Sequence, residues 1–118
     1  VYHFSTPEVG DVVVFRYPGN PSEDFIKRVV AVGDSEVEIR DGLLWVNGEP
    51  RDENFIKEPL AGEYGPVKVP DDMIFVLGDN RNNSKDSRYS DVGFLQEDEI
   101  IGQAVLIYWP LDDINWLN

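Results

Sequence analysis

A lysine set in the middle of an apolar segment is the feature of this sequence that most directly suggests chemistry. Lys27 lies within residues 24–32, a run with the composition of a buried β-strand. Burying an unpaired ammonium group costs several kcal/mol, so such a lysine is normally paired, exposed or deprotonated. Desolvation favours the neutral amine, and a pKa lowered by about three units from about 10.4 would give a base that works near neutral pH.

Side chains alternate along a strand, so the two faces of this segment can be assigned. One face would carry Phe25, Lys27, Val29 and Ala31, and the other would carry Ile26, Arg28, Val30 and Val32. Both faces are largely apolar, which predicts a strand covered on two sides. Lys27 is therefore expected to point into a desolvated and partly aromatic environment.

A structural alternative keeps this lysine charged. Its aliphatic stem would pack in the core while its head reaches Glu23, Asp24 or Glu36. Structural lysines greatly outnumber catalytic ones, so the segment alone favours this alternative.

A second polar segment, residues 78–88, follows directly on the apolar run 73–77. Its sequence, GDNRNNSKDSR, has too little apolar content to fold by itself, so internal polar bonds must hold the loop. Arg88 can bind Asp86 or Asp79 through two parallel hydrogen bonds. The segment is typical of a compact functional loop.

The structural alternative is a well-tied surface loop, with or without a calcium ion bound by its Asp, Asn and Ser oxygens. The EF-hand pattern is not matched, since Arg81 and Lys85 stand among the ligand positions and no glutamate follows at the twelfth position. The glycine pattern of a phosphate-binding P-loop is also absent.

The composition limits which other chemistry is available. The chain has 118 residues, 42% hydrophobic and 28% charged, which is typical of one soluble globular domain. A net charge of -13 argues against nucleic acid and anionic lipid as partners. The lack of cysteine excludes a thiol nucleophile, and the single histidine, His3, argues against a Ser-His-Asp triad or a multi-histidine metal site. We therefore expect no cofactor and no metal.

Short β-type segments separated by turn residues position the two polar features. Strands are predicted at residues 12–17, 24–32, 67–69, 73–77 and 101–109, and a β-hairpin at 36–47. The hairpin turns at Asp41-Gly42, and Asn47-Gly48 forms a second turn. Residues 49–66 read as a long surface excursion and 95–99 as one helical turn. Without a long helical period, the chain is predicted to be one all-β domain over residues 1–118, a folded sheet or barrel.

Three segments, in the right order, resemble the motifs of one family. Residues 10–15 (GDVVVF) resemble its strand motif GD-(I/V)-V-V-F, and residues 24–30 (DFIKRVV) resemble D-(Y/F)-I-K-R-V. Residues 78–88 resemble G-D-N-R-x-N-S-x-D-S-R almost letter for letter. The sequence is thus similar to the bacterial type I signal peptidases (leader peptidases, serine protease family S26), membrane-anchored enzymes with a Ser-Lys dyad and a LexA-like catalytic fold.

The resemblance implies a catalytic role for Lys27 as the general base, which takes a proton from a serine hydroxyl and later passes it to the leaving amine. Ser84 would hydrogen-bond the lysine and orient it. The backbone of Asp24, Phe25 and Ile26 would pair with an extended substrate by strand addition.

The same resemblance implies structural support from four charged residues. Asp79, Asp86 and Arg88 would hold the loop against the lysine strand, and Arg28 is expected to pair with Asp79.

The family's nucleophile lies in a motif S-M-x-P-T upstream of the first strand motif, and no serine here has that context; Ser5 stands in Ser5-Thr6-Pro7. We therefore expect a soluble, inactive fragment without the nucleophile segment or the membrane anchor. The full-length protein would cleave signal peptides of exported preproteins on the extracytoplasmic side of the cell membrane. Two alternatives stay open: a non-catalytic peptide-binding or pilus-assembly chaperone-like relative, and a LexA-like self-cleaving domain. Retention of Lys27 and Ser84 favours the peptidase over a non-catalytic relative. A LexA-like self-cleaving domain fits the loop at 78–88 poorly.

Overall fold

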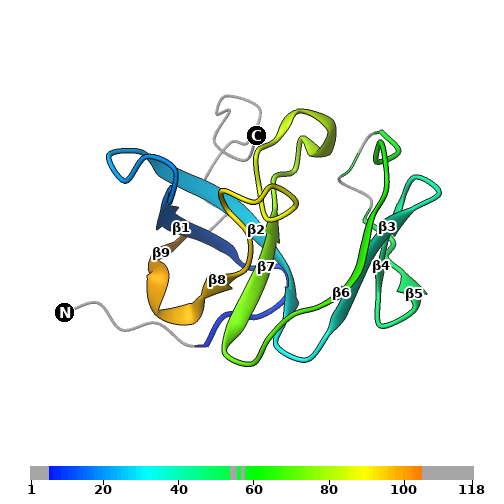
Figure 1. Cartoon of the computed structure of the whole chain (residues 1–118), viewed down its shortest axis with the longest axis horizontal. Coiled ribbons are helices and arrows are strands. Elements are labelled where there is room, and N and C mark those ends of the chain that lie inside the picture. Colours follow the sequence, from blue (N-terminus) through cyan, green and yellow to red (C-terminus); the bar gives the residue numbers. More distant parts are fainter. Residues whose placement is uncertain (1–5, 54–55, 57, 105–118) are drawn as a thin grey trace.

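The computed structural model describes residues 6–53, 56 and 58–104. These residues form two antiparallel β-sheets. The larger sheet contains, in spatial order, β8 (Leu95–Gln96), β7 (Met73–Leu77), β2 (Asp24–Val32), β1 (Val12–Arg16) and β9 (Ile100–Ala104). The smaller sheet contains β5 (Glu49–Pro50), β4 (Leu43–Val46), β3 (Glu36–Arg40) and β6 (Tyr64–Lys68). Two 3-10 helices follow β7 and β8, at Arg81–Asn83 (η1) and Glu97–Glu99 (η2). The prediction of an all-β fold is confirmed (Figure 1).

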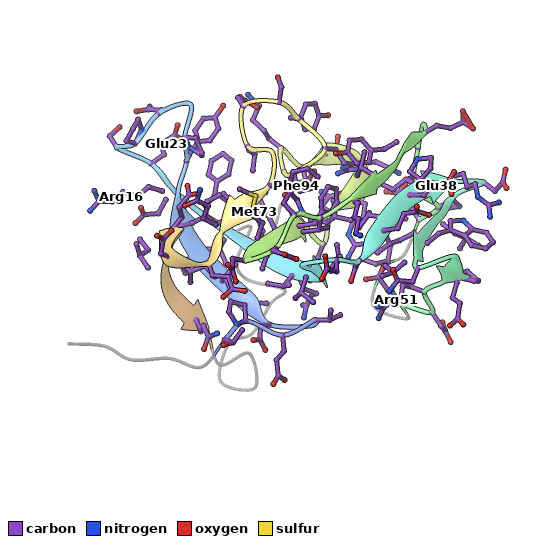
Figure 2. All side chains as sticks on the ribbon, turned by 60° about the horizontal axis from the view of Figure 1, so that its bottom comes forward. Arg16, Glu23, Glu38, Arg51, Met73 and Phe94 are labelled. Atoms are coloured by element: carbon purple, nitrogen blue, oxygen red, sulfur yellow. The ribbon has the colours of Figure 1, made fainter. Side chains whose placement is uncertain are left out.

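Strands β2 and β7 are buried on both faces, as their apolar composition predicted. One buried cluster joins them to the smaller sheet and contains Val30, Ala31, Val37, Ile39, Leu44, Val46, Leu60, Val69, Phe75 and Leu77. The cluster on the other face of the larger sheet contains Val13, Phe15, Tyr17, Val29, Ile74, Val76, Val92, Leu95 and Ile100. The loop before β8 covers part of the first cluster, where the ring of Phe94 lies 6.0 Å from that of Phe75 (Figure 2).

A β-bulge in β2 changes the predicted assignment of side chains to its faces. The register with β7 shifts between Val29 and Ala31, and one extra residue turns every following side chain to the opposite face. Val32 consequently packs with Phe25 and Val29, while Ala31 joins Val30 in the other cluster. The prediction that Ala31 shares the face of Lys27 is wrong for this reason.

The two predicted turns of the smaller sheet are confirmed. Asp41 and Gly42 connect β3 to β4 with φ values of 54° and 78°, and Asn47 and Gly48 connect β4 to β5 with φ values of 53° and 78°. These left-handed conformations suit Asp-Gly and Asn-Gly pairs, and they match the twist of the flanking strands.

The predicted surface excursion at residues 49–66 is wrong in part, because it contains strands β5 and the start of β6. Gly65 and Pro66 read as loop residues, yet both lie within β6. A Cβ atom on Gly65 would lie 2.5 Å from the backbone oxygen of Val37, so the glycine permits the close approach of β6 to β3.

The remaining differences are small. The predicted helical turn at 95–99 is the short strand β8 followed by η2, and the strand expected at 67–69 is β6, which ends at Lys68. The closing strand expected at 101–109 is β9 as far as Ala104, and its later part lies outside the described residues.

Candidate active site

Lys27 lies in the middle of β2, opposite Val13 of β1, and only 3% of its surface is exposed. Its Nζ donates a hydrogen bond of 2.8 Å to the Oγ of Ser84. The same nitrogen lies 5.1 Å from the centroid of the Phe25 ring. The structural alternative, in which the head of the lysine reaches Glu23, Asp24 or Glu36 at the surface, is therefore wrong.

Burial lowers the pKa of Lys27 from 10.5 to about 8. The carboxylate of Asp86 acts in the opposite direction, the guanidinium of Arg88 adds to the lowering, and Asp79 raises the pKa again. At pH 8 about half of the molecules would hold a neutral amine with a free lone pair. The group is thus suited to accept a proton near neutral pH.

Ser84 comes from the loop that follows β7, where it ends the helix η1 in an extended conformation. It is 5% exposed and lies 57 residues from Lys27 in the chain, so the fold brings the two side chains together. A hydroxyl of this kind accepts from an ammonium group and donates to a neutral amine, and it therefore orients the lysine in either state.

Asp86 ties the two ends of this loop to each other. Its carboxylate accepts from the Gly78 N–H at 3.1 Å and binds the Arg88 guanidinium through two hydrogen bonds of 2.8 and 2.7 Å. Ser87 fixes the loop to β7, because its Oγ accepts from the Val76 N–H at 2.9 Å. These buried bonds replace the apolar core that the loop lacks.

A second bidentate pair connects the start of the loop to β2. Arg28 donates from Nε and Nη2 to the two carboxylate oxygens of Asp79, at 2.9 and 2.8 Å. Its Nη1 also donates to the Gly10 carbonyl at 3.1 Å. The predicted pairing of Arg28 with Asp79 is confirmed, and both carboxylates of the loop are bound by guanidinium groups.

One edge of β2 beside the lysine carries no strand in the part of the chain that the structure describes. Asp24, Phe25 and Ile26 pair with β1 on one side, but β7 pairs with β2 only from Arg28 onward. An extended peptide could therefore add to this edge next to the amine of Lys27.

Comparison with known proteins gives this geometry a context. Residues 1–109 match the family described as signal peptidase, peptidase S26. The chain belongs to this family. It is 42% identical to a signal peptidase I of Leptolyngbya laminosa over 99% of this chain, and 41% identical to a probable signal peptidase I-1 of Synechocystis over 92%.

These signal peptidases are longer than the chain, which spans 60% and 58% of the two relatives. Among solved structures, a signal peptidase I of Enterococcus faecalis superposes with a TM-score of 0.75 and 28% identity. That alignment covers 87% of this chain and all of the other. None of the helices formed by residues 6–53, 56 and 58–104 is long and apolar enough to cross a membrane.

The signal peptidase motifs did not reveal every charged contact of the site. The sequence indicates for Arg81 only that it stands against calcium binding, yet its side chain is 1% exposed and binds both carboxylate oxygens of Glu53, at 2.7 and 3.0 Å. Its Nε donates to the Gly78 carbonyl at 2.7 Å. Glu53 lies 28 residues earlier, in a segment without a motif, so no local pattern indicated the pair. A cluster of Tyr17, Lys85 and Asp91 was also missed.

Proposed function

We propose that the protein containing this chain is a serine endopeptidase that removes signal peptides from exported preproteins, with Lys27 as its general base. The observation that carries the proposal is the buried hydrogen bond of 2.8 Å between Lys27 Nζ and Ser84 Oγ. Membership of the signal peptidase family supports the reaction class.

Lys27 would act in two successive proton transfers. The neutral amine accepts the proton of the nucleophilic serine hydroxyl as that oxygen attacks the scissile carbonyl, and the resulting ammonium then donates a proton to the leaving amine. A pKa of about 8 suits both steps, because the amine is available as a base and its conjugate acid is strong enough to donate. Ser84 would position Nζ rather than attack the substrate.

The substrate would bind as an extended strand along Asp24, Phe25 and Ile26. Main-chain hydrogen bonds at this edge supply affinity that does not depend on sequence, which suits an enzyme that accepts many precursors. Asp79, Asp86, Arg28 and Arg88 would keep the loop and β2 in register. We place the reaction at the cell membrane, on the extracytoplasmic side, because exported preproteins emerge there.

The test is cleavage of a preprotein with an Ala-x-Ala site by the full-length protein. Replacing Lys27 with Met removes the base and keeps the apolar stem, so kcat should fall by about 10²–10⁴-fold. Lys68, an exposed lysine on β6 that pairs with Asp34 at 4.0 Å, supplies the control Lys68→Met, whose activity should be unchanged.

Cleavage by Lys27→Met within a few-fold of the wild type would refute the assignment of the base. A wild-type protein that binds signal peptides but never cleaves them would instead support a non-catalytic peptide-binding relative.

A further inference from the structure

A cluster of polar side chains connects the β1–β2 hairpin to the part of the chain that follows Ser84, residues 85–91. Tyr17 directly follows β1, and its hydroxyl donates to the Asp91 carboxylate. The Nζ of Lys85 donates to the Tyr17 hydroxyl at 3.1 Å and to Asp91 Oδ2 at 3.0 Å. These three side chains, here called the latch, connect segments 68 and 74 residues apart in the chain.

The latch is connected to Lys27 through two residues, Ser84 and Phe25. Lys85 directly follows Ser84 in the chain, and Ser84 binds the amine of Lys27. The ring of Tyr17 stacks on the ring of Phe25, with centroids 4.3 Å apart and planes 4° from parallel. The Phe25 ring in turn lies 5.1 Å from Lys27 Nζ.

We propose that Tyr17, Lys85 and Asp91 are positioning residues, which hold Phe25 and Ser84 around Lys27 and keep water away from its amine. The inference rests on the proposed function. None of the three touches the amine in a described contact, so each acts through Phe25 or through Ser84.

The charges of the latch allow its positioning role to be distinguished from a direct electrostatic effect on Lys27. Hydrogen bonds from Tyr17 and Lys85 lower the pKa of Asp91, and hydrogen bonds to Tyr17 and Asp91 raise the pKa of Lys85. Both groups therefore stay charged between pH 6 and 10, and their charges compensate each other. Replacing Tyr17 with Phe changes no charge, so any effect on Lys27 must come from position or hydration.

The charged groups that act directly on the amine are Asp79, Asp86 and Arg88, and they lie outside the latch. Their own partners are Arg28 for Asp79 and the mutual pair of Asp86 with Arg88. None of these contacts involves a residue of the latch.

Gly19 offers an independent way to disturb the latch. A Cβ atom at this position would lie 2.5 Å from the Cζ and Oη atoms of Tyr17. Gly19→Ala would therefore push the phenol ring off its stack on Phe25 without removing any polar group of the latch.

The experiment measures the pH dependence of kcat/KM for preprotein cleavage by the full-length protein, between pH 6 and 10. In Tyr17→Phe and Gly19→Ala, water would approach the amine of Lys27. The acidic limb of the kcat/KM profile should then shift to higher pH by about one unit. Activity at pH 7 would then fall about tenfold and recover above pH 9.5. Lys68→Met, which removes an exposed lysine of the smaller sheet, should keep the wild-type profile.

An acidic limb that stays in place in Tyr17→Phe and Gly19→Ala would overturn the proposal, whether the rate is unchanged or reduced equally at every pH. If both variants fail to fold, the double variant Lys85→Met/Asp91→Asn decides by the same readout, because it removes both charges of the latch together and the two side chains are 50% and 37% exposed. The proposed function fails separately, through activity that survives in Lys27→Met.

Discussion

The ion pair of Arg81 with Glu53 gives the sharpest prediction about what holds the site together. Replacing Glu53 with Gln keeps the size of the side chain but leaves the Arg81 guanidinium, 1% exposed, without its counter-charge. Gln has one carbonyl acceptor, so only one of the two hydrogen bonds of 2.7 and 3.0 Å can persist. A charge-assisted hydrogen bond contributes about 1.5–3 kcal/mol, and removing one partner of a buried pair costs about 3–5 kcal/mol. Because the Arg81 Nε bond to Gly78 remains, we expect a loss of about 2–4 kcal/mol.

Urea unfolding followed by far-ultraviolet circular dichroism measures this loss. The matched control is Glu38→Gln, because Glu38 on the smaller sheet (Figure 2) pairs with Arg40 at 3.2 Å and the two side chains are 28% and 39% exposed. Such a pair contributes about 0–1 kcal/mol, so the control should unfold almost as the wild type does. The reasoning is refuted if the two variants lose the same stability. It is also refuted if Arg81→Met/Glu53→Leu is less stable than Glu53→Gln, because removing both charges leaves no buried charge unpaired.

Three further predictions concern Lys27 and Ser84. The acidic limb of kcat/KM should lie near pH 8, with activity rising about tenfold per unit below it, and a limb below pH 6 would contradict the lowered pKa of Lys27. The folded state lowers this pKa from 10.5 to about 8 and so binds fewer protons than the unfolded state between these values; stability should therefore rise with pH across this window. Between pH 7 and 10.5 the free energy of unfolding of the wild type, measured with urea, should rise by about 3 kcal/mol relative to that of Lys27→Met. Equal pH dependence of the two proteins would contradict the lowered pKa of Lys27. Ser84→Ala should lower kcat by about 10–10²-fold with KM unchanged, because the amine loses an orienting partner at 2.8 Å; a rise in KM alone would show that Ser84 binds substrate instead.

The sequence allowed the prediction of what local patterns determine. The continuous apolar composition of residues 24–32 and 73–77 predicted two buried strands, because a strand covered on both faces needs apolar side chains at successive positions. The Arg28–Asp79 contact was instead implied by the resemblance to the signal peptidases, because no local pattern connects residues 51 positions apart. The bulge after Val29 was not predictable, since an extra residue in a strand leaves the composition unchanged.

Contacts between distant segments formed the other gap. Glu53 lies in a stretch that reads as a polar loop, and nothing in its neighbours distinguishes it from Asp52 or Glu58. Tyr17 reads as the last residue of a strand, and its contact with Asp91 exists only because the hairpin and the loop lie together in the folded chain. The start of strand β6 was missed because glycine and proline, here Gly65 and Pro66, are depleted in strands, while the reason for a glycine there is the close backbone oxygen of Val37 on β3.

These contacts bear on how a site with several charged groups can hold a lysine whose pKa is lowered to about 8. Each carboxylate near Lys27 already carries its own guanidinium: Asp79 binds Arg28, and Asp86 binds Arg88. A lone carboxylate at the same place would stabilise the ammonium form and raise the pKa of the lysine. Desolvation is nevertheless the largest influence and lowers the pKa of Lys27 to about 8, although Asp86 and Asp79 still act to raise it. The guanidinium of Arg88 adds to this lowering, so the arginine that binds Asp86 acts on the amine as well as on the loop.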